Sequence, residues 1–577
     1  MYYNFKKYKV KHFSEKIEIE GKSFSSYVKI SLQNEFNHPI TSFVRGVISM
    51  KNIIEQYKQN NEIILDNGYV TEFDINKIRT HLSIDSLSIV KLSAQNCFFN
   101  SQKELNFSKI NLTQKYLNFS YAYILQGKLN FHGSQLAIET NNFSNIVFNS
   151  GDIEFDNVQF GNKTNSFKNS VFKNGFKNFQ YANFSNGEAN FTNVSFGNGD
   201  VSFINSNFIN SKPTFKVSTF EKGKVDFHYA HFGDKNISFE RVQFGEGPVD
   251  FSKIEFGSGK LNFNRSIFVK GDINFEGIDL KNGRLTFKRV KFISNHIDFS
   301  EANCSGSTLL FESAFLGNST FSFKKVSANT ISFQSCHLNN YVDFRVKMVN
   351  NIILSDCVVR DILDFIPYNH EVRINTLDLN GMRLIGKIFL DWKKNNVFKI
   401  IHNQKQTSET EKGYQFRLLK ENFHNTGEYE AEDQSYIFFK RYESKAILEN
   451  DLKKSIWNKL WAYPNYYFKD LLLDKAGLYA TAPVRVLWSM LITYIFFSLL
   501  LIGTTFLEIG NLTGSSGHSI LSTISDAFYF SAITYLTVGY GDLCPLGIGR
   551  WIAGIEGFVG VFLMAYFTVA FVRKVLR

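Results

Sequence analysis

The stretch VDFSKIEFGSGK, residues 249–260, contains two Phe residues five positions apart. Each Phe follows an aliphatic residue by two positions: Val249 precedes Phe251, and Ile254 precedes Phe256. Residues i and i+2 of an extended strand point to the same side, so both pairs are expected to point into a core.

The first Phe of this unit recurs every twelve residues without interruption. The nineteen positions are Phe107, Phe119, Phe131, Phe143, Phe155, Phe167, Phe179, Phe191, Phe203, Phe215, Phe227, Phe239, Phe251, Phe263, Phe275, Phe287, Phe299, Phe311 and Phe323. A repeat this regular predicts a solenoid, in which each coil buries its apolar face on its neighbours. We expect two twelve-residue repeats in each coil, with one repeat per coil as the alternative. Glycines such as Gly245 and Gly257 follow the second Phe and are expected to allow the turns.

The units Val249–Lys253 and Ile254–Ser258 resemble two consecutive units of the pentapeptide-repeat family, with Gly259 and Lys260 as a two-residue insertion. The resemblance implies a right-handed β-solenoid, whose interior the Phe residues are expected to fill. Between residues 107 and 323, 22 Lys and Arg nearly balance 19 Asp and Glu. This balance argues against both DNA mimicry and nucleic-acid binding, despite the formal net charge of +11 for the whole chain.

A helical pattern follows the solenoid. Phe416, Leu419 and Phe423 share one face of a predicted helix, which Gly427 breaks, and a second helix is expected from Glu428 onward. This hairpin is similar to those that join pentapeptide-repeat regions to channel pores, and to single tetratricopeptide units. It is expected to pack against itself or its symmetry mates, with peptide binding as the alternative.

The next segment, Asp451–Tyr463, is expected to form an amphipathic helix that ends at Pro464. Its apolar and aromatic residues are Leu452, Ile456, Trp457, Leu460 and Trp461, and its lysines lie elsewhere. A Trp- and Lys-bearing helix just before an apolar span is typical of the membrane interface. The alternative is a helix packed within a soluble domain.

Two apolar stretches are long enough to cross a membrane. Val486–Leu507 contains no charged residue, and Ile552–Val572 is interrupted only by Glu556. Basic residues flank the outer ends of this pair, at Arg485, Arg573, Lys574 and Arg577, whereas the 508–550 loop carries only Arg550 besides His518. By the positive-inside rule both termini are expected in the cytoplasm, with the protein in the inner membrane.

Two further observations agree with a cytoplasmic N-terminal region. Met1–Lys7 lacks the apolar run of a secretory signal. The five cysteines have no CxxC spacing, which is typical of a reducing compartment and argues against a zinc site.

The loop between the spans contains Thr537-Val538-Gly539-Tyr540-Gly541. A short helix, Ala527–Leu536, is expected before it, capped by Ser525 or Asp526, with the negative pole of its dipole towards the motif. A dehydrated potassium ion needs a cage of carbonyl oxygens, and glycines permit the alternating backbone that aims successive carbonyls at one axis. We assign the coordination to the carbonyls of residues 537–540 and the Thr537 hydroxyl. Asp542 is expected at the outer mouth.

Residues 483–577 therefore resemble the pore of bacterial two-transmembrane potassium channels. The resemblance implies passive, K⁺-selective transport through a homotetramer, because one loop supplies one quarter of the cage. K⁺ is then the permeant ion and the only metal expected, with no cofactor. No catalytic motif favours an enzyme. Membrane lipid and three further copies of the chain are the expected partners.

Two residues of the second span are candidates for further roles. Gly560 is a candidate gating hinge, with close helix packing as the alternative. Glu556 is an acid inside a span, which is costly, and we expect it to support the back of the filter.

The sequence thus predicts four parts: an N-terminal cap (1–90), a solenoid (91–400), a cytoplasmic helical adaptor with an interfacial helix (401–482) and a pore domain (483–577). We expect the solenoid to be a sensor that gates the pore from the N-terminal side, with a protein or small-ligand activator. The alternative is a protein-binding scaffold or tether that localises the pore without gating it. A membrane-depolarising defence role fits this layout.

Overall fold

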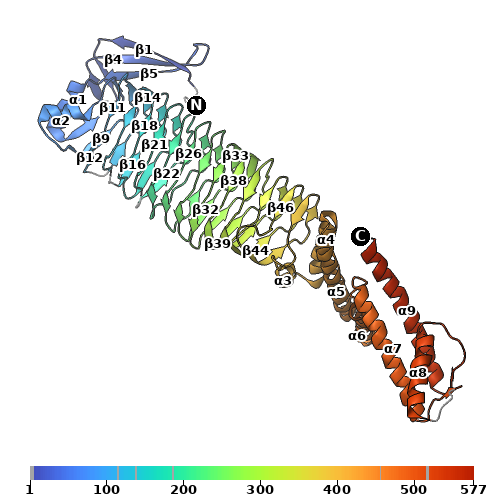
Figure 1. Ribbon diagram of the computed structural model, residues 1–577. Helices are drawn as coiled ribbons and strands as arrows, with labels where there is room; N and C mark the ends of the chain where they lie inside the picture. Colours follow the sequence, from blue (N-terminus) through green and yellow to red (C-terminus); the bar gives the residue numbers. More distant parts are fainter. Residues whose placement is uncertain are drawn as a thin grey trace. The chain divides into compact units, whose positions relative to one another are not determined.

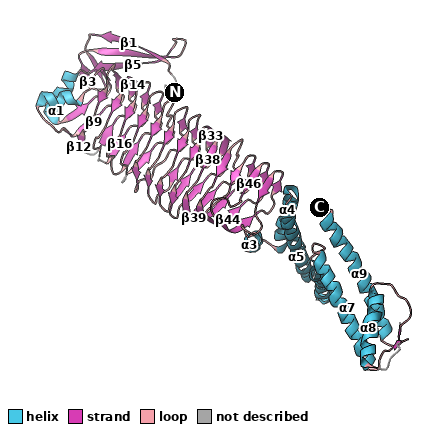
Figure 2. Cartoon of the chain, in the orientation of Figure 1, coloured by secondary structure: helices cyan, strands magenta, loops and turns pink. Residues whose placement is uncertain are grey.

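A computed structural model of the chain describes residues 5–113, 116–136, 139–184, 187–454, 456–514 and 519–576. The chain divides into two compact units, Met1–Gln404 and Lys405–Arg577. The first is built mainly from strands and the second from helices (Figure 2). His518, Arg577 and the side chains of Ile456 and Trp457, on which some predictions rested, lie outside the described part of the chain.

Each coil of the regular tract has four short strands. One coil consists of β26 (Val225–Asp226), β27 (His231–Phe232), β28 (Ile237–Ser238) and β29 (Gln243–Phe244). The next coil begins at β30 (Val249–Asp250), which pairs in parallel with β26 so that Val225 lies opposite Val249, its equivalent two repeats later. The prediction of two repeats per coil is confirmed, and the coils stack in order along the first unit (Figure 1).

One column of strands runs through the whole stack as a 13-stranded parallel sheet. Its members are β11 (Leu105–Asn106), β15 (Leu129–Asn130), β18 (Ile153–Glu154), β21 (Lys177–Asn178), β23 (Val201–Ser202), β26, β30, β34 (Ile273–Asn274), β38 (His296–Asp298), β40 (Thr320–Ser322), β43 (Val342–Asp343), β46 (Ile362–Asp364) and β49 (Lys387–Phe389).

The Phe residues of the twelve-residue period fill the interior, as predicted. Phe203 stacks on Phe227 of the next coil with ring centroids 4.8 Å apart, and meets Phe215 edge-on at 5.5 Å. Two ladders of stacked rings therefore run side by side and touch edge to face, an arrangement that aromatic quadrupoles favour.

The corners of the coils differ from the prediction that glycines supply the turn. The residue two positions after the first Phe is left-handed although it is usually not glycine, as at Asn205 (φ 53°) and Val217 (φ 62°). Gly199 does adopt a positive φ of 99°, but Gly245 does not. A Cβ on Gly245 would lie 1.8 Å from the Glu221 carbonyl oxygen of the preceding coil, so this glycine permits close stacking instead.

The last coils have three strands instead of four. β39 (Asn303–Leu310) pairs with β35 (Asp279–Leu280) at one end and β36 (Arg284–Thr286) at the other, which removes the corner between their columns. The next coil contains β40, β41 (Ser327–Ser332) and β42 (His337–Leu338). Without that corner the coil shortens, so that Phe321 pairs with Val342 and not with a residue two full repeats later. This shortening explains why the Phe period stops at Phe323.

Strands expected to close the solenoid near residues 377–379 and 388–390 are present. They correspond to β47 (Arg373–Asp378) and β49, and helix α3 (Val397–His402) follows them.

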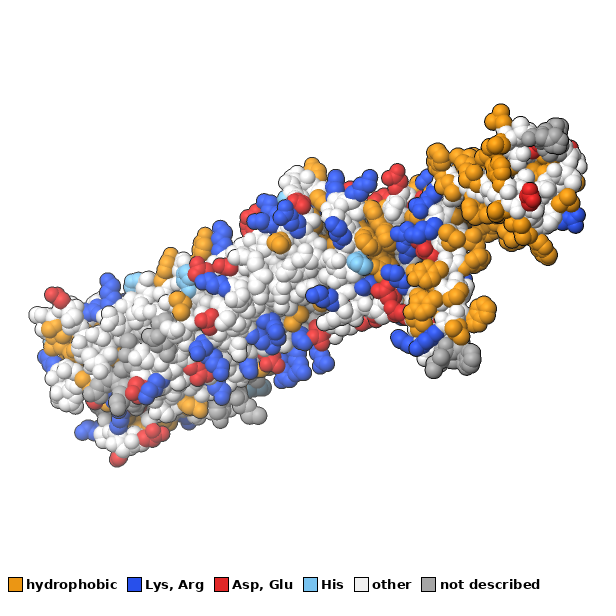
Figure 3. Space-filling view, turned by 90° about the horizontal axis from the view of Figure 1, so that it is seen from below, with side chains coloured by type: hydrophobic (Ala, Val, Ile, Leu, Met, Phe, Trp, Pro, Cys, Tyr) orange, Lys and Arg blue, Asp and Glu red, His pale blue; other side chains and the backbone are white. Residues whose placement is uncertain are grey.

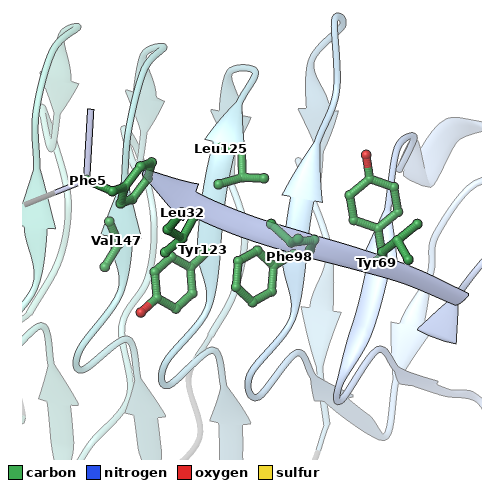
Figure 4. Packing of buried hydrophobic residues seen from close by; sticks show 9 residues of the cluster. Phe5, Leu32, Tyr69, Phe98, Tyr123, Leu125 and Val147 are labelled. Atoms are coloured by element: carbon green, nitrogen blue, oxygen red, sulfur yellow. The ribbon is translucent and has the colours of Figure 1, made fainter. Parts of the chain in front are cut away.

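An antiparallel sheet covers the first coils. It contains β1 (Lys7–Phe13), β4 (Tyr27–Gln33) and β5 (Pro39–Val47), and helices α1 (Met50–Asn60) and α2 (Ile75–Leu82) follow. Leu32 of β4 lies beside Tyr123 and belongs to one buried cluster with Tyr69 and Phe98, which come from the coils before it (Figure 4). Parallel pairing is already present where β6 (Glu62–Ile64) meets β9 (Lys91–Ser93), so the first coil starts within the segment predicted as a cap.

The second unit begins with the predicted helical hairpin. It consists of α4 (Glu409–Thr426) and α5 (Tyr429–Lys454), in which Phe416 stacks on Tyr442 with ring centroids 5.4 Å apart. Gly427 ends α4 in a left-handed conformation with φ 77°, as the sequence indicated.

The prediction that Pro464 ends the following helix is wrong. Helix α6 (Ile456–Lys469) continues through Pro464, and a π-helical segment η2 (Asp470–Lys475) follows it. A proline inside a helix removes one backbone hydrogen bond and bends the helix without always ending it. The unit ends with three helices, α7 (Pro483–Phe506), α8 (Ile520–Tyr535) and α9 (Gly549–Val575).

Candidate functional site

Helices α7 and α9 are long and apolar enough to cross a membrane, with mean hydropathies of 2.2 and 2.0 in their most apolar windows. Large apolar side chains remain exposed on both, including Trp488 of α7 and Phe558 of α9. Figure 3 shows hydrophobic side chains gathered over this part of the surface. Exposed apolar faces on such helices are suited to lipid.

Helix α8 packs against both of these helices. Ala527 and Phe530 of α8 belong to one buried cluster with Phe497 of α7 and Ile552 of α9. The helix begins at Ile520, where the Ser519 side chain accepts a hydrogen bond from the Ser522 amide. The prediction of a shorter helix that starts at Ala527 after a Ser525 or Asp526 cap is therefore wrong, because the serine-rich segment before it is helical as well.

The loop that follows α8 has an alternating backbone. Thr537, Gly539 and Gly541 have φ angles of 58°, 58° and 81°, whereas Val538 and Tyr540 do not lie in the positive-φ region. Alternation turns successive peptide planes in opposite senses, which is the arrangement that aims their carbonyls along one line. Left-handed conformations at the two glycines were predicted, whereas the one at Thr537 was not.

Hydrogen bonds tie this loop to the end of α8. The Val538 amide donates to the Ile533 carbonyl at 2.8 Å, and the Thr537 hydroxyl donates to the Leu536 carbonyl at 2.7 Å. A hydroxyl that donates its hydrogen still offers oxygen lone pairs to a cation. At the far end of the loop, the Tyr529 hydroxyl donates to the Asp542 carboxylate at 2.9 Å.

The loop leaves apolar and aromatic side chains uncovered within one chain. Val538 is 49% exposed and Tyr540 is 74% exposed. A Cβ built on Gly539 or Gly541 would have no atom of the chain within 4 Å. Within one chain, space is therefore open beside both glycines.

A buried polar contact lies behind α8. The Ser531 hydroxyl donates to the carboxylate of Glu556, which is fully buried in α9. The second carboxylate oxygen of Glu556 has no hydrogen-bond partner among the residues that the structure describes. The Tyr535 hydroxyl is 2.7 Å from Thr493 Oγ1 of α7, which holds the end of α8 from the other side.

Gly560 lies where α9 crosses the end of α8. A Cβ at this position would be 2.1 Å from the Tyr535 carbonyl oxygen. Helix α9 is continuous through Gly560. These facts support the alternative that this glycine permits close helix packing.

The sequence prediction missed the residues that hold α8 and the end of the loop in place, namely Thr493, Tyr529, Ser531 and Tyr535. Their signal was weak, since each is one polar group in a largely apolar helix. In the described residues, no group of three or more His, Cys, Asp or Glu is arranged to hold a metal ion.

Comparison with known proteins shows what this region is similar to. The model of the Ion channel family matches residues 489–577. Protein LctB of Bacillus caldotenax is 47% identical over 51 residues, and protein LctB of Geobacillus stearothermophilus shows the same identity over the same length. These alignments cover 9% of this chain and 38% of each relative. No solved structure matches the chain. The chain thus joins a β-solenoid to a C-terminal segment that matches the Ion channel family and contains two candidate membrane helices.

Proposed function

We propose that this protein is the subunit of a K⁺-selective ion channel, with K⁺ as the permeant ion and no cofactor. The observation that carries the proposal is the alternating backbone of residues 537–541 at the C-terminal end of α8. This loop lies between two candidate spans, in a segment that matches the ion channel family. The carbonyls of Thr537, Val538, Gly539 and Tyr540, with the Thr537 hydroxyl, replace the hydration shell of the ion.

The negative pole of the α8 dipole stabilises a cation beyond Tyr535. The Asp542 carboxylate, positioned by Tyr529, concentrates cations at the outer mouth. Glu556 supports α8 from behind through Ser531. The close approach of Gly560 to the Tyr535 carbonyl supports a packing role for this glycine, and a gating hinge at the same position stays a prediction.

The working unit is a homotetramer, since one loop supplies only one quarter of a closed cage. The exposure of Val538 and Tyr540 and the open space beside Gly539 support this assembly. Both ends of the chain lie in the cytoplasm and the pore in the inner membrane, because Arg485 and Arg573 flank the two spans on one side. The solenoid is the sensor for a protein or small-molecule activator.

Flux of K⁺ and Na⁺ into liposomes that contain the purified chain tests the proposal. The wild type is expected to carry K⁺ in preference to Na⁺. Gly539→Ala is expected to abolish this preference, because a left-handed alanine costs about 1–2 kcal/mol and adds a methyl group beside the ion path. Gly503→Ala is the matched control, since Gly503 lies in the helical conformation of α7 with open space at its Cβ. Equal K⁺ and Na⁺ flux through the wild type would refute the K⁺ selectivity.

A further inference from the structure

Salt bridges join the C-terminal end of α9 to the adaptor helix α5. The Asp433 carboxylate of α5 lies 3.3 Å from both Arg573 Nη2 and Lys574 Nζ. Asp433 is only 6% exposed, and the Arg573 guanidinium lies over the Tyr436 ring at 4.3 Å from its centroid. A carboxylate this buried depends on its cationic partners, so the contact resists separation of the two helices.

A second contact lies two turns earlier on α9. The Tyr566 hydroxyl donates to the Leu473 carbonyl at 2.7 Å and accepts from the Ala480 amide at 2.8 Å. One hydroxyl therefore bridges both ends of the segment that leads from η2 to α7. A Cβ on Gly477 would lie 2.6 Å from the Tyr566 ring, so the segment closes tightly around this side chain.

The bridged segment contains a strained turn. Leu478, Tyr479 and Ala480 are consecutive non-glycine residues with φ angles of 50°, 58° and 61°. Residues other than glycine rarely adopt this backbone conformation, because it is strained. Such strain persists where surrounding contacts hold it, and it is common in segments that switch between conformations.

The N-terminal side of the turn is held by Asp474, which accepts two hydrogen bonds from Arg441 of α5 at 2.7 and 2.9 Å. These hydrogen bonds raise the pKa of Arg441, which favours the charged form of its guanidinium. Helix α5 therefore grips both the turn that leads into α7 and the end of α9.

We propose that Asp433, Arg573, Lys574, Tyr566 and the turn Leu478–Ala480 form a latch by which the adaptor sets the open–closed equilibrium of the pore. The inference rests on the proposed channel function and adds the route by which the pore is regulated. In this proposal the adaptor acts on the second span, α9, as well as on the first span, α7. A displacement of α5 has to carry the end of α9 with it or break the ion pairs.

Single-channel recording of the full-length chain in planar bilayers tests the latch. Asp433→Asn and Tyr566→Phe are each expected to change the ratio of open to closed time by about fivefold or more, in the same direction. The permeability ratio of K⁺ to Na⁺ is expected to stay unchanged, because neither residue contacts the loop of residues 537–541. The controls are Asp451→Asn on α5 and Tyr414→Phe on α4, both outside the latch.

A double-mutant cycle separates the latch from a general loss of structure. In an Arg573→Gln/Lys574→Gln background, Asp433→Asn is expected to change the open-to-closed ratio by less than about twofold, because its partners are already neutral. K⁺-selective currents with an unchanged ratio in both single variants would overturn the latch and leave the channel function standing. A wild-type chain without K⁺ current would overturn the channel function and the latch with it.

Discussion

At the scale of single residues, Lys177 places a charged group in the solenoid core. It occupies the aliphatic position two residues before Phe179 and is fully buried. Its ammonium group donates to the Asn198 carbonyl at 2.6 Å, and burial lowers the pKa of Lys177 from 10.5 to about 8. Above pH 8 the folded chain therefore binds fewer protons than the unfolded chain, so this group makes stability rise with pH up to about 10.5.

Replacing Lys177 by Met tests this pH dependence. In the wild type, the shift contributes about 2 kcal/mol to the rise in unfolding free energy between pH 7 and pH 10. Lys177→Met is expected to remove that part of the rise, measured by urea unfolding of residues 1–404, whereas the exposed Lys235→Met is expected to keep it. Lys173, whose pKa burial also lowers to about 8, contributes its own part of the rise in the wild type and in both variants. An identical pH dependence in wild type and Lys177→Met would contradict the prediction.

At the scale of elements, α6 and η2 carry an apolar surface beside the first span. Its exposed side chains are Leu460, Trp461, Tyr463, Tyr467, Phe468 and Leu471. Aromatic residues are favoured at the boundary between headgroups and hydrocarbon, and α6 leads through η2 to α7. We propose that this surface lies in the cytoplasmic leaflet, as expected for an interfacial helix.

Spin labels in the full chain measure the depth of this surface. A nitroxide on Trp461→Cys is expected to be more accessible to oxygen than to a water-soluble nickel complex, because oxygen concentrates in the bilayer. A nitroxide on Lys459→Cys, which lies about 160° around the helix from Trp461, is expected to show the opposite preference. Cys544 is exposed and is first replaced by Ser. Equal, water-like accessibility at both positions would place α6 outside the lipid.

The sequence could predict an element wherever one local rule acted alone. The Phe period indicated the coil because every coil repeats the same contacts. Gly427 could be recognised as the end of α4 because a left-handed glycine ends a helix without a contact from elsewhere in the chain. The three-stranded coils escaped prediction, since the fusion of two strand columns in β39 leaves no periodic signal. The predicted helix end at Pro464 was wrong because the effect of a proline on a helix depends on how the neighbouring turns pack. Tyr566 could not be recognised, because its partners lie more than eighty residues away in the chain.

At the scale of the whole molecule, the chain consists of two units with different chemistry. The first unit, Met1–Gln404, is a stack in which each coil contacts its neighbours. The second unit, Lys405–Arg577, contains the adaptor together with the candidate filter and latch. All residues proposed for ion selectivity belong to the second unit, so selectivity and sensing are expected to be separable.

Deletion of residues 1–404 tests this separation. The remaining chain is expected to keep the permeability ratio of K⁺ to Na⁺, because its filter is unchanged, and to differ from the full chain in open probability by about fivefold or more. Both quantities are measured by single-channel recording in the same lipid. An unchanged open probability would refute the sensor and favour the tether, and a pull-down with residues 1–404 would then seek the tethered protein.

The parallel register of the coils also has a genetic consequence. Duplication of the gene segment for two consecutive repeats adds one coil and returns every later strand to its own column, since Val225 and Val249 occupy equivalent places. Duplication of a single twelve-residue repeat preserves the Phe spacing but exchanges opposite columns in all later coils. Descendants of this gene are therefore expected to vary in solenoid length by whole coils of two repeats, and not by single twelve-residue repeats.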